Sequence, residues 1–510
     1  MIKKCVIALA SLLVLWFIVD YEVADKEHTL TIGGPFEFTS QDLSKDGYLY
    51  TRMQVAQGLV DVQPNGTFTP LLATRWNKSH DGLQWAFTLR SDVKFHDGSQ
   101  LTPNVVKHSL EVAMAKPGII NQVPIEQITT TYNTVIIKLS EPYRPLLGIL
   151  AHFSTAVLSP SSYNSDGSVA KLFGSGPYQT SVIAPPHKLH VTRFDDYWGQ
   201  PAAIEQAHYL TGHRAESRAL QAQSGQADLI YTLDPASLDQ LQRSNNLTVH
   251  SESIPRTVII KLNNDHPFLN HADIRQALSL VIDRQGLSQH IIRVPNSEAY
   301  ELFPPALGDW HLNAESAHSR NLPMAKELLA RHGWALNDQQ LLERDGETFK
   351  LNMVTYADRP ELTVLATALQ AQFREVGIEV SITVDNSSAI PSRHHDGTLE
   401  LALIARNFGA IADPLALLLD DFEHHSGGDW GVMNWSSTPL KDLLDRMKSE
   451  DNSEAYTLMA QQVAQILADE MPLIPVTFYT QQVSVNNRVV NFVFDPFENN
   501  YRISEMTFND

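Results

Sequence analysis

Two adjacent histidines are the residues of this chain best suited to bind a metal ion. His424 and His425 lie in a segment rich in glycine and serine, residues 423–430. A neutral imidazole is a good ligand for nickel, so this pair is our candidate metal site. The alternative is that both are solvated surface residues. A second pair, His394 and His395, precedes an Asp-Gly turn, and we expect it at the surface.

Arginine and aromatic side chains are the other residues that could hold a small molecule. Arg52 and Arg406 could each grip a carboxylate through two parallel hydrogen bonds, although structural ion pairs are the alternative. Flat rings offer contact area at low entropic cost, with core packing as the alternative role. The aromatic candidates are Tyr48, Phe408, Trp430 and Trp435. Three glycines flank Trp430, which indicates a backbone shaped for close approach.

No arrangement of residues indicates covalent catalysis. The chain has no GxxxxGK[ST] phosphate loop and no HExxH zinc helix, and Gly174-Ser175-Gly176 lacks the spacing of a nucleophile elbow. The single cysteine, Cys5, lies in the leading apolar segment. We therefore predict a binding protein without a bound cofactor. A secreted metallohydrolase that uses the histidines is the alternative from another class. A DNA-binding regulator would need a helix-turn-helix before residue 30, where the apolar segment leaves no room.

Length and charge narrow the class of protein further. A chain of 510 residues exceeds one ordinary core, so two or three domains are expected. Its 38 Lys and Arg against 58 Asp and Glu give a net charge of −20, which argues against a nucleic-acid partner.

The first 24 residues are typical of an export signal. Lys3 and Lys4 precede an uncharged, mostly apolar run over residues 5–19. A signal peptidase could cut after Ala24, but Glu22, two positions earlier, is unfavourable for cleavage. An uncleaved membrane anchor is therefore the alternative. Either way the folded part lies outside the cytoplasmic membrane. Lipidation of Cys5 is disfavoured, because no apolar stretch precedes it.

The local patterns predict mixed α and β structure. Trp85, Phe87 and Leu89 alternate with polar residues after an Asp-Gly turn, which indicates a half-buried strand. Thr102 and Pro103 are typical of a helix start. Further expected elements are two helices, one that begins after Thr438-Pro439 and one that begins at Ser453. The second should bury Leu458, Ala460, Val463 and Leu467 or their neighbours. Apolar strands are expected over 257–262 and 473–479.

The segment 70–105 resembles the family-5 extracellular solute-binding proteins of bacterial ABC importers. It follows their pattern of P-x-L-A-x-x-W, then D-G-x-x-[WY]-x-F-x-L-R, then V-x-F-H-D-G. Further matches in order are the segments EPYRPLL at 141–147, GSGPY at 174–178, DDYWG at 195–199, SGQADL at 224–229 and DIRQALS at 273–279. The resemblance covers nearly the whole chain from about residue 29.

The resemblance implies an α/β, two-lobed periplasmic-binding-protein-like fold of type II. Its lobes would be joined by the two crossover strands, and they would close around a ligand. After the signal or anchor at 1–24, lobe one would hold 25–260 plus 475–510, with an extra subdomain at about 60–190. Lobe two would hold 261–474. The implied partners are the membrane subunits of an ABC permease and a small molecule, bound by a monomer in the periplasm.

The segment 405–414 bears on which ligand is carried. In oligopeptide binders of the family an aspartate in the matching segment pairs with the peptide amine, whereas here Ile411 or Ala412 takes that position. Asp413 is expected to cap the following helix. The segment is closer to the nickel and metallophore binders, although Ala412 replaces the aromatic residue typical of them.

We therefore expect a nickel chelate or an opine-type metallophore as the carried ligand, with a di- or oligopeptide as the alternative. The predicted ligand-binding residues are Tyr48, Arg52, Arg406, Asn407, Phe408, Ile411, Trp430 and Trp435, with His424 and His425 as metal ligands.

Overall fold

The computed structural model describes residues 28–212, 214–313 and 319–509. The predicted signal or anchor at 1–24, with Cys5, lies outside these ranges. Within them, no helix has both the length and the apolar character that crossing a membrane would require.

A ten-stranded sheet runs through the whole molecule and confirms the α/β class. Its strands, in spatial order, are β17 (Glu379–Asp385), β16 (Lys350–Tyr356), β18 (Leu401–Asn407), β12 (Leu247–Leu262), β19 (Leu473–Asn486), β11 (Leu229–Tyr231), β1 (Thr29–Gly34), β10 (Gln206–Thr211), β9 (Lys188–Arg193) and β8 (Tyr178–Ala184). The short strands outside it are β2 (Val60–Val62), β3 (Phe68–Pro70), β13 (Ala335–Leu336), β14 (Leu342–Arg344), β15 (Glu347–Thr348), β20 (Val489–Val490) and β21 (Thr507–Phe508).

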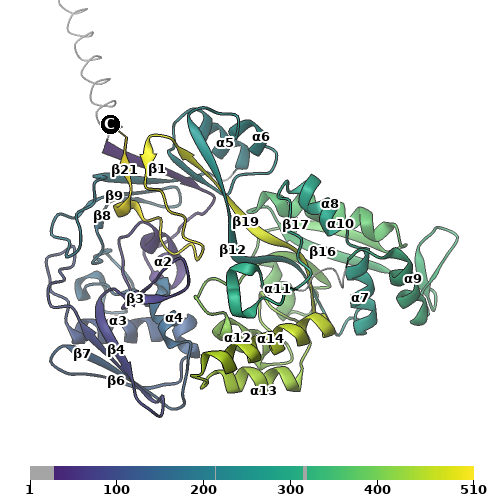
Figure 1. The fold of residues 1–510 in the computed structure, drawn as a ribbon, viewed down its shortest axis with the longest axis horizontal. Coiled ribbons are helices and arrows are strands. Elements are labelled where there is room, and N and C mark those ends of the chain that lie inside the picture. The colour runs from purple at the N-terminus through teal and green to yellow at the C-terminus, as the bar shows by residue number, and fades with distance from the viewer. Residues whose placement is uncertain (1–27, 213, 314–318, 510) are drawn as a thin grey trace, which may run out of the picture.

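The two longest strands, β12 and β19, pair antiparallel and cross between the two halves of the molecule (Figure 1). Their register shifts between Ser253 and Thr257. Beyond that break β12 also pairs with β18, whereas the far end of β19 pairs with β11. The apolar strands expected at 257–262 and 473–479 are present, and each continues into the other half of the sheet.

Each half of the sheet has its own apolar core. One core draws on residues between 254 and 479, and the other on residues from 30 to 231 together with 483–506. Because the chain leaves the first half and returns to it through β12 and β19, these strands are the covalent connections between the cores. We retain the predicted division into 25–260 plus 475–510 and 261–474 as a proposal.

Helices cover the sheet on both halves (Figure 1). They are α2 (Leu43–Arg52), α3 (Pro103–Met114), α4 (Leu146–Ala151), α5 (Ala215–Gln223), α6 (Leu238–Leu241), α7 (Ala272–Val281), α8 (Arg284–Gly286), α9 (Leu322–Arg331), α10 (Pro360–Arg374), α11 (Ala389–His395), α12 (Leu415–Glu423), α13 (Thr438–Met447) and α14 (Ser453–Glu470). The helices expected from 438 and 453 are confirmed. Leu458 itself is 55% exposed, and its neighbour Met459 is buried in its place, since the inward stripe of α14 runs through Met459, Ala460, Val463 and Leu467.

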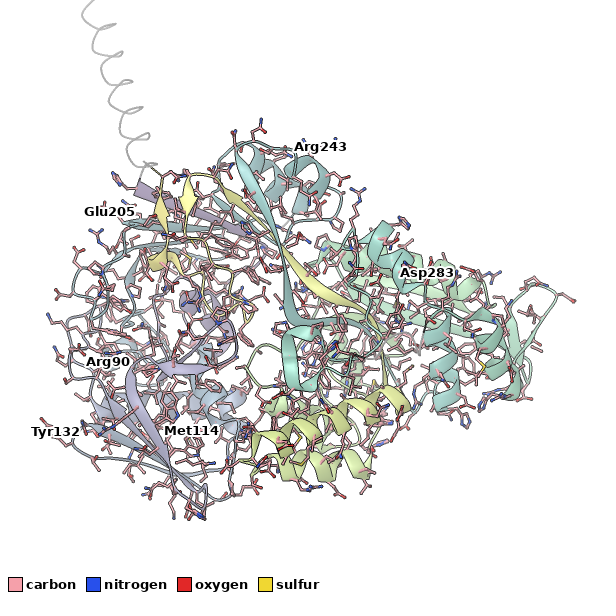
Figure 2. All side chains as sticks on the ribbon, in the orientation of Figure 1. Arg90, Met114, Tyr132, Glu205, Arg243 and Asp283 are labelled. Atoms are coloured by element: carbon pink, nitrogen blue, oxygen red, sulfur yellow. The ribbon has the colours of Figure 1, made fainter. Side chains whose placement is uncertain are left out.

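A separate four-stranded sheet forms the subdomain between residues 59 and 157. Its order is β4 (Ala73–Lys78), β5 (Gln84–Leu89), β7 (Thr134–Leu139), β6 (Ile125–Thr130). Trp85, Phe87 and Leu89 of β5 point into its core, as predicted. Thr102 caps α3 by accepting from the backbone N–H of Val105 at 3.3 Å, also as predicted. At the outer tip of this sheet Tyr132 stands free in solvent (Figure 2).

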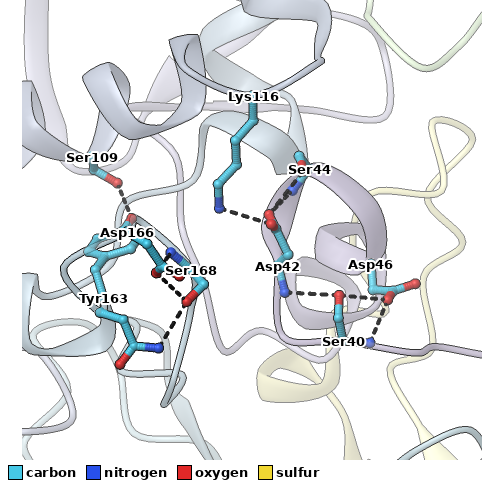
Figure 3. Close-up of polar contacts among 10 residues, drawn as sticks. Ser40, Asp42, Ser44, Asp46, Ser109, Lys116, Tyr163, Asp166 and Ser168 are labelled. Carbon is cyan, nitrogen blue, oxygen red and sulfur yellow. Dashed lines mark hydrogen bonds and ion pairs between the residues drawn. The ribbon is translucent and has the colours of Figure 1, made fainter.

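Polar contacts attach this subdomain to α2 (Figure 3). Lys116, just beyond α3, donates to Asp42 at 2.9 Å, and Asp42 caps α2 through the N–H of Ser44. Partial burial opposes ionisation of Asp42, but the bonds from Lys116 and Ser44 hold its pKa below the usual value. On α3, the hydroxyl of Ser109 lies 2.9 Å from that of Tyr163. The subdomain is therefore fixed to the first core.

The same subdomain also touches the second core. Ile411 packs into the cluster of the subdomain against Gly148, where a Cβ would come within 2.1 Å of the isoleucine side chain. Arg144 reaches across as well: its guanidinium lies 3.9 Å from the ring centroid of Tyr456, and its Nη1 donates to the carbonyl of Glu450 at 2.7 Å. These contacts hold the two cores together at the end opposite the crossing strands.

We expect Arg144→Ala to favour an open form of the unliganded protein. It removes a cation–π contact and a charge-assisted hydrogen bond, together worth about 1–2 kcal/mol. Small-angle X-ray scattering should give a larger radius of gyration for the variant. Arg75→Ala on the exposed face of β4 is the matched control and should scatter like the parent protein. Identical curves for all three proteins would contradict a closing role for Arg144.

Candidate ligand-binding cleft

A cleft of about 590 Å³ lies between the two cores. The first core contributes residues 35–37, which follow β1, and the second core contributes most of the remaining wall. The lining residues are Pro35, Phe36, Glu37, Arg256, Tyr356, Asp358, Arg359, Asn386, Ser387, Ala405, Arg406, Asn407, Ala410, Leu417 and Trp430. This volume suits a small organic molecule or a small complex.

Three arginines line this cleft, each brought there by a different element. Arg256 lies at the register break of β12, Arg359 immediately precedes α10, and Arg406 lies near the end of β18. The break in β12 and the antiparallel pairing of β12 with β18 place Arg256 opposite Asn407, next to Arg406. Three guanidinium groups thus come from segments up to 150 residues apart in sequence.

Each arginine is anchored from behind. Arg256 donates to Glu498 at 2.6 Å, Arg359 donates to the hydroxyl of Tyr479 at 3.0 Å, and Arg406 forms an ion pair with Asp421. Nε and Nη1 of Arg256 and Nε of Arg406 are buried without a hydrogen-bond partner. A buried N–H of a guanidinium needs an acceptor. Because Arg256 and Arg406 line the cleft, we infer that a carboxylate bound there would supply the acceptor that these donors lack.

The charges around the cleft also favour binding of an anion beside Arg256 and Arg406. Burial opposes ionisation of Glu498, but Arg256, Arg52 and Arg359 lower its pKa to about 2. Burial and the neighbouring Arg359 both lower the pKa of Arg256. A cation with a lowered pKa is one whose charge is incompletely compensated, so a bound carboxylate would stabilise it. Glu37 and Asp358 also line the cleft and could accept a positive group of the same ligand.

Aromatic rings complete the walls. Trp430 meets Tyr356 edge to face with ring centroids 6.0 Å apart, and the hydroxyl of Tyr356 accepts from the backbone N–H of Ala405. Phe36 faces them from the first core and packs edge to face on Tyr48. Rings from both cores are thus available to cover a ligand once the cleft closes.

The sequence-predicted residues fall into three groups. Arg406, Asn407 and Trp430 line the cleft. Tyr48 and Arg52 stand behind its wall: the Arg52 guanidinium lies 5.1 Å from the Phe36 ring centroid, and the Tyr48 hydroxyl donates to the carbonyl of Glu37 at 2.6 Å.

The third group is buried away from the cleft. Phe408 packs on Phe303, Ile411 packs in the subdomain cluster, and Trp435 packs on Phe422. Core packing, the alternative role given to the aromatic candidates, is what the structure shows for Phe408 and Trp435.

His424 and His425 lie on an exposed turn, and His425 is 3.2 Å from Asp265. Among residues 28–212, 214–313 and 319–509, no three His, Cys, Asp or Glu side chains are placed to share a metal ion. Metal binding by His424 and His425 therefore stays a prediction. The expected exposure of His394 is wrong: it is buried at the end of α11, beside Lys261 of β12.

Asp413 lies one position before Pro414, the N-cap residue of α12, and bonds the first N–H of that helix. Its Oδ1 accepts from the N–H of Leu415 at 2.9 Å, and its Oδ2 accepts from the hydroxyl of Tyr456 at 2.6 Å. Burial raises the pKa of Asp413. Since both oxygens are engaged inside the protein, Asp413 is not placed to pair with a ligand amine.

The lining residues that the sequence analysis missed include Phe36, Arg256, Tyr356 and Arg359. One signal was available. Arg256 follows Pro255 and directly precedes the apolar run 257–262, where a charged residue stands out. No comparable signal marks the other three, because their shared wall exists only in the folded chain.

Comparison with known proteins gives concordant results. The sequence pattern of "Bacterial extracellular solute-binding proteins, family 5 Middle" matches residues 67–426. The nickel-binding protein NikA of Staphylococcus aureus is 23% identical over 87% of both chains, and the nickel-binding periplasmic protein of Escherichia coli is 25% identical over 88% of both. The dipeptide-binding protein of E. coli is 21% identical over 84% of both.

Solved structures show the same fold. NikA of S. aureus in complex with Ni(L-His)2 superposes with a TM-score of 0.81 at 21% identity, covering 94% of this chain and 100% of its own. The oligopeptide-binding protein AppA of Bacillus subtilis with a nonapeptide gives 0.82 at 19%, covering 94% and 99%. AgaA of A. tumefaciens with agropinic acid gives 0.80 at 20%, with the same coverage.

Proposed function

The chain belongs to the family-5 bacterial extracellular solute-binding proteins, and from this premise we propose that it captures a small carboxylate-bearing ligand for an ABC importer. The family consists of binding proteins and not of enzymes, in line with the sequence-based prediction. The protein would act in the periplasm as a monomer. Its N-terminal segment would direct export or anchor it to the inner membrane, and a permease in that membrane would receive the ligand.

The observation that carries the proposal is the set of unpartnered guanidinium donors on Arg256 and Arg406. A carboxylate bound there would engage β12 and β18 of the second core and lie opposite Phe36 of the first. Such a ligand touches both cores only when the cleft is closed, so it stabilises the closed state over the open one. The closed state is then recognised by the permease.

The ligand we favour is a nickel chelate or an opine-type metallophore. Both classes carry carboxylates. Among the structural relatives, one was solved with the nickel chelate Ni(L-His)2 and another with agropinic acid. A chelate brings its own metal ligands, so the cleft needs arginines and aromatic walls rather than protein groups that bind the metal. The cleft described above supplies those two features.

A di- or oligopeptide is the second candidate, and one observation favours it. Glu37 and Asp358 line the cleft together with the arginines. They could hold the ammonium of a peptide while Arg256 and Arg406 hold its carboxylate. Peptide binders occur among both the sequence and the structural relatives.

Titration calorimetry on the purified protein separates these candidates. We expect binding of Ni²⁺ only when L-histidine is also present, or binding of an opine such as agropinic acid, with affinities in the micromolar range or tighter (about −8 kcal/mol). Ni²⁺ alone and L-histidine alone are the controls. Tight binding of a dipeptide library with no response to the chelates would replace the first candidate by the second.

A further inference from the structure

Lys261 of β12 is buried with its ammonium inside the second core. Its side chain is 0% exposed, and Nζ has three close neighbours. They are Nδ1 of His394 at 2.7 Å, the carbonyl oxygen of Gly428 at 2.7 Å and the carbonyl oxygen of Asp429 at 2.9 Å. A lysine ammonium has three hydrogens to donate, so these three acceptors match its charged form.

Two of the three acceptors belong to the segment that carries Trp430 into the cleft. Asp421 fixes the same segment from the other side. A Cβ on Gly428 would come within 2.3 Å of the Asp421 carboxylate, and one on Gly431 within 2.2 Å, so the glycines let the backbone wrap around it. Asp421 in turn pairs with Arg406. Lys261 and Asp421 thus hold the segment 427–431 between β12 and α12.

We propose that Lys261 is a positioning residue for the cleft, and that the proton on its side chain controls how firmly the segment 427–431 and Trp430 are held. The neutral amine keeps two hydrogens and gains a lone pair. One acceptor would lose its bond, and the lone pair would face a carbonyl or imidazole lone pair. Loss of the proton therefore loosens the segment and Trp430, although Lys261 itself does not line the cleft.

The groups that surround Lys261 allow this proton to leave near neutral pH. Burial lowers the pKa of Lys261 to about 7, while Asp421 and Asp429 raise it and Arg406 lowers it. On α11, burial and Lys261 lower the pKa of His394 to about 4, so its imidazole is neutral and can accept. His395, on the same helix, lies 2.8 Å from Asp429.

Affinity and stability should then respond to pH in opposite directions. Below about pH 7 the ammonium of Lys261 bonds to the segment 427–431. Above this pH one of these hydrogen bonds is lost, so the affinity for the ligand falls as pH rises. In the unfolded chain Lys261 keeps its proton up to about pH 10.4. Between these two values the unfolded state binds more protons, so this group's contribution to folding stability rises with pH. If Lys261 had only a structural role, ligand affinity would not fall with pH while its contribution to folding stability rises.

The inference rests on the proposed function, and one arm of its test needs ligand. Calorimetry from pH 6 to 9 measures the dissociation constant of the protein for Ni²⁺ in the presence of L-histidine, or for agropinic acid. The concentration of free ligand is corrected at each pH for the ligand's own protonation. We expect about a tenfold loss of affinity for the parent protein over this range. Lys261→Met should bind weakly at every pH with a flat profile.

Lys441→Met is the matched control, since Lys441 also donates to a backbone carbonyl, that of Glu423 at 2.8 Å, but lies outside this cleft. It should follow the parent profile. An unchanged affinity and profile in Lys261→Met would overturn the proposal.

A second arm needs neither ligand nor variant. Hydrogen exchange of the parent protein at pH 6 and pH 9, corrected for the intrinsic rate, should show protection falling selectively in peptides that cover 424–435. Equal protection at both pH values would overturn the role of Lys261 even if Lys261→Met fails to fold. If none of the ligands binds, the proposed function fails while this arm still decides the inference.

Discussion

Replacing Arg256 by methionine is expected to weaken binding of the carboxylate ligand by about 100-fold or more. The change removes Nε and Nη1, two buried donors that have no partner inside the protein. Hydrogen bonds from a buried guanidinium to a carboxylate are charge-assisted, and losing such a pair costs about 3 kcal/mol. Calorimetry with the ligand identified by the panel of chelates, opines and dipeptides measures the effect directly.

Arg243→Met is the matched control for this variant. Arg243 is an exposed arginine just beyond α6, on the outer surface of the molecule (Figure 2). It should bind like the parent protein. A thermal unfolding curve for each variant separates loss of binding from loss of folding. Parent-like affinity in a folded Arg256→Met protein would show that the carboxylate is held elsewhere.

The largest loss of stability is expected for Arg284→Met. The Arg284 side chain is buried and donates to three backbone carbonyls, those of Ser279, Ala299 and Pro475, at 2.7–3.0 Å. Methionine fills much of the space but removes every donor of the guanidinium. The carbonyl of Ser279 keeps one partner, the N–H of Ile282, whereas the guanidinium bonds to the carbonyls of Ala299 and Pro475 are lost. Each unpaired buried acceptor costs about 1–3 kcal/mol, so we expect a loss of about 4 kcal/mol or more. Urea unfolding followed by circular dichroism gives the difference in unfolding free energy.

Arg293 is the control for Arg284, since it also lies in the second half of the molecule but pairs with only one exposed side chain. Arg293 pairs with Asp239 at 3.0 Å, and both side chains are largely in solvent. Arg293→Met should change the unfolding free energy by less than about 1 kcal/mol. Equal effects of the two substitutions would mean that the carbonyls around Arg284 find other donors.

The fold was predictable because its signals are local or shared by a family. The alternation at Trp85, Phe87 and Leu89 and the cap at Thr102 depend on neighbours in sequence, and both are confirmed. The buried stripe of α14 was predicted only to within one residue, with Met459 buried in place of Leu458, because periodicity does not fix the exact rotation of a helix. His394 was misjudged because its partner, Lys261, lies 133 positions away.

The cleft was only partly predictable for the same reason. Arg406 and Asn407 lie in the segment 405–414 that the family resemblance marks, and Trp430 is marked by the glycines that flank it; all three line the cleft. Arg256 and Arg359 belong to β12 and to the start of α10, and only the pairing of β12 with β18 brings them to Arg406. Arg52 was assigned to the ligand, whereas its guanidinium supports Phe36 from behind. Sequence identified the residue types, and the sheet order decided which of them meet.

The position of β19 in the sheet has a consequence for how the chain acquires its structure. β19 lies between β12 and β11, and more than 200 residues separate it from β12 in sequence. During synthesis both neighbouring strands present open edges until the chain is nearly complete, and open edges invite association with other chains. The first half cannot close its sheet before the second half has been made. Because β19 also pairs with β12 in the second half, we expect its docking to be the late, slow step of folding for both halves.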